Sequence, residues 1–145
     1  MASKTNPTRI QLKGTGTHEE RRAAAAIRPG DLVQFISTDK VQKHPTAGGP
    51  AEPAFALEDA LQGRGIDDNY AADELVAIGI QTPGDVVYAW LSGGENAVIG
   101  AYLTSNGDGA LKVAGGTDSR IGVAVTAVNA ADSNDVDERI RIRLL

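Results

Sequence analysis

The sequence predicts a mainly β protein with a small antiparallel body, one short helix and an extended N-terminal arm. The first observation is a set of three runs rich in β-branched and aromatic residues, at 75–81, 86–91 and 98–104. The second is that a glycine-containing turn sequence follows each run, TPGD, SGGEN and SNGDG in order. Asn-Gly followed by Asp-Gly between two apolar runs is a strong hairpin signal. These features predict an antiparallel meander at the centre of the chain.

Length and composition favour one domain with a thin core. The chain has 145 residues and 17 glycines; 41% of it is hydrophobic but only 4% is aromatic, so the apolar volume per strand is modest. We therefore expect residues 1–26 to form an arm and linker, and residues 27–145 a single β-rich domain that gains further burial from neighbouring copies or a partner.

The N-terminal segment has the features of an arm that docks on another surface. Residues 1–17 are polar except for an alternating patch in which Ile10 and Leu12 share a face beside Arg9. Residues 18–26, HEERRAAAA, are too short to form a stable helix alone and are predicted to be a linker. We predict that the arm is disordered until strand addition and charge pairing dock it. The candidate arm contacts are Arg9, Ile10, Leu12, Arg21 and Arg22.

The remaining elements follow from apolar spacing and turn residues. Residues 28–36 are a strand entered through a Pro-Gly-Asp turn, residues 37–53 are a loop, and residues 53–62 have a helical pattern that stops at Gly63. Residues 110–113 and 120–129 are strands. In residues 138–145, ERIRIRLL, the aliphatic side chains lie on one face and three arginines on the other. This segment is predicted to be the closing strand of the sheet.

Charge is distributed unevenly along the chain, whose net charge is −5. Residues 1–43 hold eight Lys or Arg against four acids, and residues 44–136 hold three against thirteen. Opposite charges within one small protein favour head-to-tail contact between copies or a basic arm on an acidic surface, although solvated tails and loops would give the same count.

The sequence offers no motif for catalysis, a metal or a cofactor. Cysteine is absent, and the two histidines, His18 and His44, lie in predicted linker and loop, where we expect them to be solvated. Acidic pairs occur at residues 58–59, 67–68 and 73–74, and such residues more often cap helices or fix turns than form a hydrolase site. We expect no enzyme activity and no cofactor.

Four aromatic residues in the central stretch are candidates for either the core or a contact face: Tyr70, Tyr88, Trp90 and Tyr102. Residues 75–111 contain no Lys or Arg, which argues against a nucleic-acid platform on the central sheet. No apolar run is long enough for a membrane span, and the first residues lack the apolar region of a signal peptide. We expect a soluble, non-secreted protein. The candidate contact face on the body comprises Asp67, Asp68, Tyr70 and Trp90.

Four segments of the sequence resemble a known protein family. They are RPGDLVQF, ALEDALQGRGIDDNYAADELV, PGDVVYAWLSGG and GAYLTSNGDGALKV. Residues 29–113 resemble the head-decoration, or capsid cement, proteins of tailed bacteriophages.

The resemblance implies a β-barrel or β-tulip-like body with an extended arm, in homo-oligomers that are commonly trimers. It also implies binding to the major capsid protein on the outer surface of the virion, where the oligomers brace the shell, and synthesis in the host cytoplasm. The alternatives are a phage tail or host-surface binding module, and a small hydrolase that uses the acidic cluster.

Overall fold

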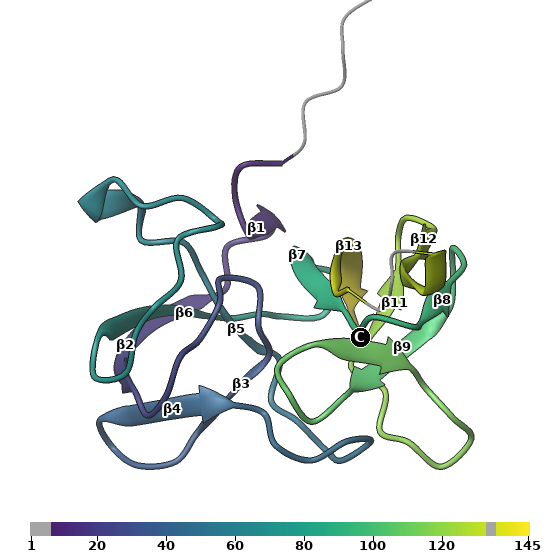
Figure 1. Cartoon of the computed structure of the whole chain (residues 1–145), viewed down its shortest axis with the longest axis horizontal. Helices are drawn as coiled ribbons and strands as arrows, with labels where there is room; N and C mark the ends of the chain where they lie inside the picture. Colours follow the sequence, from purple (N-terminus) through teal and green to yellow (C-terminus); the bar gives the residue numbers. More distant parts are fainter. Residues whose placement is uncertain (1–6, 133–135) are drawn as a thin grey trace, which may run out of the picture.

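The computed structural model describes residues 7–132 and 136–145, and its strands form two lobes that lie side by side (Figure 1). The strands of the first lobe are, in sheet order, β3 (Val33–Phe35), β4 (Lys40–Lys43), β2 (Thr17–Ala23), β6 (Leu75–Ile80) and β5 (Ala54–Ala56). A bridge between Leu32 and Phe55 brings the two edges of this sheet together. The first lobe is therefore a small, nearly closed barrel.

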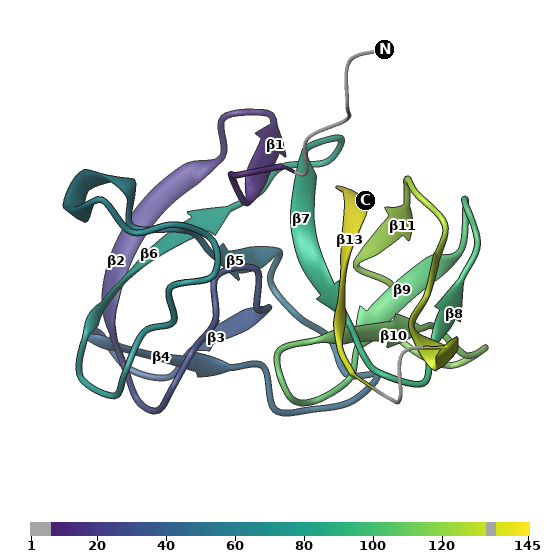
Figure 2. The same cartoon turned by 45° about the horizontal axis from the view of Figure 1, so that its top comes forward.

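The second lobe is a barrel closed through β7 (Figure 2). The strands of its sheet are, in order, β1 (Gln11–Lys13), β7 (Val86–Leu91), β10 (Leu111–Val113), β9 (Tyr102–Ser105), β11 (Gly122–Ala124) and β13 (Glu138–Leu144). The ring closes because β13 also pairs with β7 over six residues. A short ribbon of β8 (Asn96–Ala97) and β12 (Val128–Asn129) lies beside it. The prediction of a mainly β, barrel-like body is confirmed.

The predicted meander is wrong at its first two turns. Its first two strands, β6 and β7, lie in different sheets, and β10 lies between β7 and β9. The turn at residues 82–85 does not form a hairpin: the Gly84 N–H donates to the Leu144 carbonyl, and the Asp85 carboxylate accepts the Thr82 N–H. These bonds direct the chain from one lobe to the other. The hairpin predicted at residues 105–109 is confirmed, because β9 and β10 pair antiparallel with Ser105 opposite Leu111.

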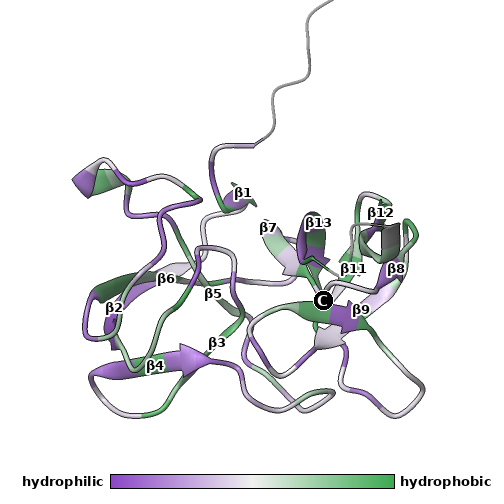
Figure 3. Ribbon diagram, viewed as in Figure 1, coloured by the Kyte–Doolittle hydropathy of each residue, from purple (hydrophilic) through white to green (hydrophobic). Residues whose placement is uncertain are grey.

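Each lobe has its own hydrophobic cluster, and the two clusters meet at the junction. Phe55 of β5 and Leu32, which bridges to it just before β3, pack in the cluster of the second lobe. In β13, Ile140 and Ile142 are fully buried, which confirms the predicted face of this closing strand. Figure 3 shows hydrophobic β6 paired with the hydrophilic strand β2. The side chains of β2 therefore do not explain its position.

The segment predicted to be a linker is a central strand. β2 lies between β4 and β6 and pairs with β6 from Thr17 opposite Ile80 to Arg22 opposite Leu75. Its inward Arg21 is accommodated by a salt bridge of 3.1 Å to Glu19 and lies over the ring of Phe35. Two neighbouring strands supply the hydrogen bonds that the isolated segment lacks, so tertiary pairing overrides its helical composition.

The prediction of an extended arm is also wrong for residues 7–26. Residues 1–6, the rest of the predicted arm, lie outside the described residues. Ile10 is fully buried; its N–H donates to the Glu58 carboxylate at 2.9 Å and its carbonyl accepts the Tyr88 N–H at 2.7 Å. β1 then pairs with β7 of the same chain. Strand addition occurs as predicted, but on the chain's own second lobe.

The predicted helix at 53–62 is replaced by β5 and one 3-10 turn, η1 (Ala60–Gln62). Residues 54–56 are fully buried and pair with β6, whereas the Leu61 side chain is fully exposed, so no amphipathic helical face exists here. Gly63 ends the turn with φ of 73°. In the two described ranges, no helix is both long and apolar enough to cross a membrane.

We predict that Ile10→Ala lowers the free energy of unfolding by about 3 kcal/mol, because it leaves a cavity at a fully buried position. Urea denaturation measures this change. Leu12→Ala, at a half-buried position in β1, is the control and costs clearly less. Equal small losses from both variants would contradict the packing of Ile10 in its own chain.

Candidate functional site

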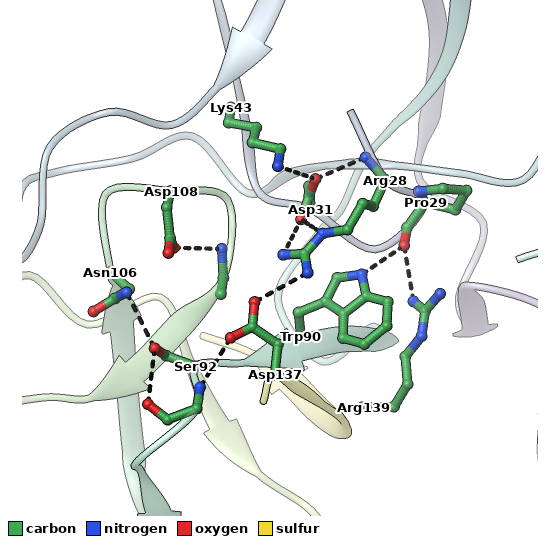
Figure 4. A network of polar contacts seen from close by, with 12 residues as sticks. Arg28, Pro29, Asp31, Lys43, Trp90, Ser92, Asn106, Asp108, Asp137 and Arg139 are labelled. Carbon is green, nitrogen blue, oxygen red and sulfur yellow. Dashed lines mark hydrogen bonds and ion pairs between the residues drawn. The ribbon is translucent and has the colours of Figure 1, made fainter. Parts of the chain in front are cut away.

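Trp90 lies at the junction of the two lobes and is held on its ring and at its indole nitrogen (Figure 4). The guanidinium carbons of Arg139 and Arg28 lie 3.9 Å and 4.5 Å from its ring centroid. Its indole N–H donates to the Pro29 carbonyl at 3.0 Å. The ring is half-buried and fully engaged within the chain. Trp90 therefore joins the lobes and is not a free contact residue.

Arg139 reaches from β13 to two segments of the first lobe. Its guanidinium donates to the carbonyls of Pro29 at 2.8 Å and Ile66 at 2.7 Å, and lies 3.6 Å from the Asp67 carboxylate. Burial lowers the pKa of Arg139, and Asp67 opposes this effect. One side chain thus fixes the loop at 65–68 against the second lobe.

A second set of charges surrounds Asp31, which is fully buried. The Arg28 guanidinium donates to Asp31 at 2.9 Å and to Asp137 at 3.0 Å, and Lys43 lies 3.6 Å from Asp31. Burial raises the pKa of Asp31, although both cations oppose the shift. Burial acts to lower the pKa of Arg28, but its two carboxylate partners outweigh this and raise it. The cluster links residues 28–31, β4 and the start of β13.

The predicted contact face on the body is only partly exposed. Tyr70 is 1% exposed, and its hydroxyl donates to the Leu57 carbonyl at 2.6 Å. Burial raises its pKa to about 12. Tyr70 is a core residue, because the bridge between Ile27 and Tyr70 and the surrounding strands close over the ring. Its assignment to a contact face is corrected.

Asp67 and Asp68 are exposed, as a contact face requires. The Asp68 carboxylate accepts the Gly65 N–H at 2.7 Å, which is the turn-fixing role expected of such residues. Both aspartates line a groove of about 530 Å³ together with Tyr88 and Arg139. The fold thus brings the turn at residues 65–68 next to β7, the strand that carries Tyr88 and Trp90.

The five predicted arm contacts do not form one surface. Ile10 and Arg21 point into the body, Leu12 is half-buried, and Arg22 donates to the Asp73 carbonyl at 3.0 Å. Arg9 is exposed at a separate groove of about 470 Å³, described below.

The two histidines have different environments. His18 is exposed and lies 3.2 Å from the Gln11 side chain. His44 is 2% exposed, with ring nitrogens 2.7 Å from the Ser105 hydroxyl and 3.0 Å from the Pro50 carbonyl, so the expectation that it is solvated is wrong. Over residues 7–132 and 136–145, no group of three or more side chains is arranged to hold a metal ion.

Sequence reasoning missed Arg28 and Arg139 as partners of Trp90. Residues 75–111 lack basic residues, yet the fold places two arginines on the indole from outside that stretch. The alternation in residues 138–145 was the available signal, since it places Arg139 on the outward face of the strand that pairs with β7.

Two small barrels joined through an arginine-tryptophan junction define the class of fold. No protein family and no curated protein matches the sequence. Among solved structures, the chain is similar to the head fiber gp8.5 N base of bacteriophage phi29, with a TM-score of 0.61 and 11% sequence identity. The match covers 89% of this chain and 93% of that chain. The two proteins therefore share a fold over nearly their full lengths.

We predict that Tyr70 makes the protein sensitive to alkali. Between pH of about 10 and about 12 the unfolded tyrosine ionises while the folded one keeps its proton, so stability present below pH 10 is lost as pH rises, by about 3 kcal/mol in full. Urea denaturation at increasing pH measures the loss. Tyr70→Phe, which cannot ionise, is the control; an identical pH dependence in this variant would contradict the prediction.

Proposed function

We propose that the chain is a structural protein of a tailed-phage virion that binds the outside of the head and stabilises the shell, without catalysis. The observation that carries the proposal is the fold shared with a phage head fiber base over 89% of the chain. The resemblance of residues 29–113 to head-decoration proteins supports it independently, because that resemblance rests on sequence phrases and not on the fold.

The proposed partners are the major capsid protein and further copies of the chain, with a trimer as the simplest homo-oligomer. The protein is then made in the host cytoplasm and ends on the outer surface of the virion. Neither nucleic acid nor a membrane is a proposed partner. Residues 1–43 carry a net positive charge and residues 44–136 a net negative charge, which supports contacts with charged surfaces.

The fold changes which residues are proposed to make the capsid contact. Because β1 pairs with β7 and β2 with β6 in the same chain, residues 11–23 would have to give up these pairings to cross to the shell. Asp67 and Asp68 are exposed and stand on a loop held in place by Arg139, so they suit a rigid contact. We assign the capsid contact to the groove at 65–68.

The alternatives are a tail or host-surface module and a small hydrolase. The similarity to a head fiber base favours attachment to a head over attachment to a tail. For a hydrolase, Asp67 and Asp68 would act as the reactive carboxylates; their contacts with Arg139 and the Gly65 N–H support a positioning role instead. Calorimetric titration with Mg²⁺ or Ca²⁺ separates these cases, since the structural role requires no binding.

We predict that the protein sediments with heads of the phage that encodes it, when these are assembled without it, and not with its tails or host cells. Asp67→Lys combined with Asp68→Lys should weaken this binding about tenfold or more, because it reverses the charge of the contact. Sedimentation at a series of protein concentrations measures the affinity.

The matched control reverses two exposed acids elsewhere, Asp39→Lys with Glu52→Lys, and should bind as the unchanged protein does. Failure of the unchanged protein to sediment with heads would refute the proposed function. Equal binding by both double variants would refute only the assignment of the contact to residues 67 and 68.

A further inference from the structure

The outward face of the second lobe carries arginines that the fold does not use. On β13, Arg141 and Arg143 point to the same side as Arg139, but neither forms an ion pair with any residue in ranges 7–132 and 136–145. Among the described residues no carboxylate lies at ion-pair distance from either guanidinium, although the net charge of the chain is −5. They are available to an acidic surface outside the molecule.

These arginines adjoin exposed apolar side chains. Arg143 is opposite Val123 of β11, which is opposite Tyr102 of β9, and Arg120 stacks over the Tyr102 ring at 4.1 Å. The loop before β9 is tied to β11 by the Gly100 N–H, which donates to the Ala124 carbonyl. It exposes two aliphatic side chains. We name this surface the arginine face; its members are Val98, Ile99, Tyr102, Arg120, Arg141 and Arg143.

The groove of about 470 Å³ in the first lobe has the complementary character. Its charged lining has four carboxylates and one guanidinium, that of Arg9, and apolar side chains of Leu57 and Ile78 also line it. Leu61, fully exposed, stands at its border on the η1 turn. We name this site the acidic groove; its acidic members are Glu19, Glu20, Glu58 and Asp59.

Two of these carboxylates are free to meet a partner. Glu19 is paired with Arg21, and Glu58 accepts the Ile10 N–H. Glu20 and Asp59 have no ion pair with any described residue of the chain. The unpaired acids of the groove thus match the unpaired bases of the arginine face in sign, and both surfaces combine charge with exposed aliphatic groups.

The two surfaces lie on different lobes. The η1 turn projects from the first lobe at the upper left of Figure 1, whereas β9 and β11 lie in the second lobe on the right. A surface and its complement at separate places on one molecule cannot satisfy each other within that molecule. They can do so between copies, as a heterologous contact in which each copy offers one surface and receives the other.

We infer that copies of this chain associate head to tail, with the arginine face of one copy docked on the acidic groove of the next. Arg141 and Arg143 pair with Glu20 and Asp59, while Tyr102 and the aliphatic side chains of both surfaces leave water together. A heterologous contact of this kind closes into a ring when the rotation allows it. This inference rests on the proposed homo-oligomer and names its contact.

The test is the mass of the protein in solution, measured by sedimentation velocity from micromolar to about 1 mM protein at low salt. The unchanged chain should exceed its monomer mass of 15.1 kDa and dissociate as salt rises. The double variant R141E/R143E and the double variant E20R/D59R should each associate at least about tenfold more weakly.

Recombining the variants makes the test specific. Each double variant alone has one native and one reversed surface, which carry charge of the same sign. In an equal mixture of the two, the native surfaces complement each other and so do the reversed ones, so the mixture should regain the association that each variant alone has lost. The quadruple variant, with both charges exchanged, should regain association with itself. The control is Lys40→Glu, on β4 and outside both surfaces. Like Arg141→Glu or Arg143→Glu, it replaces a positive side chain by a negative one, but it should leave association unchanged. Trp90 fluorescence reports whether every variant keeps the lobe junction.

A monomer at about 1 mM and low salt would overturn the inference, and so would undiminished association of either double variant. Sedimentation with phage heads distinguishes this failure from failure of the proposed function. A chain that associates through these surfaces but does not bind heads refutes only the function; one that binds heads but stays monomeric in solution refutes only the head-to-tail contact.

Discussion

The structure depends on one arrangement, the indole of Trp90 held between Arg28 and Arg139 with the Pro29 carbonyl shared by the indole and Arg139. Each cation-π contact contributes about 1 kcal/mol, and more where water is excluded. The larger constraint is that the donors of Arg139 are buried and must be satisfied. Its terminal nitrogens donate to the Pro29 and Ile66 carbonyls of the first lobe and to the Tyr88 carbonyl of β7, so separating the lobes would remove two of these three bonds.

This junction explains why a chain with a thin core forms two barrels. Each lobe encloses a small, mostly aliphatic cluster with one buried aromatic ring, Tyr70 in the first and Phe55, from a strand of the first sheet, in the second. The crossing of β1 onto β7 adds a second covalent connection between the lobes, because β1 leads directly into β2. Small barrels joined in this way close their edges and leave few strands open to aggregation.

The rigidity of the junction also shapes the proposed interactions. The loop at 65–68 is held by Arg139, so its acids occupy fixed positions beside Tyr88. Arg141 and Arg143 point outward from β13, the same strand that places Arg139 on the Trp90 ring. One strand therefore organises the join between the lobes and an exposed charged face, and a partner on that face would contact a surface that needs little ordering.

The sequence alone determined the mainly β class, the hairpin at residues 105–109, the inward face of β13 and the turn role of Asp68, because each depends on neighbouring residues and on side-chain periodicity. Only the tertiary structure decided that residues 18–23 form a central strand, that Ile10 and Tyr70 are core, and that Arg28 and Arg139 clamp Trp90. These features depend on hydrogen bonds and packing between segments far apart in the chain. Local composition does not specify such partners, and in HEERRAAAA it even favours a helix.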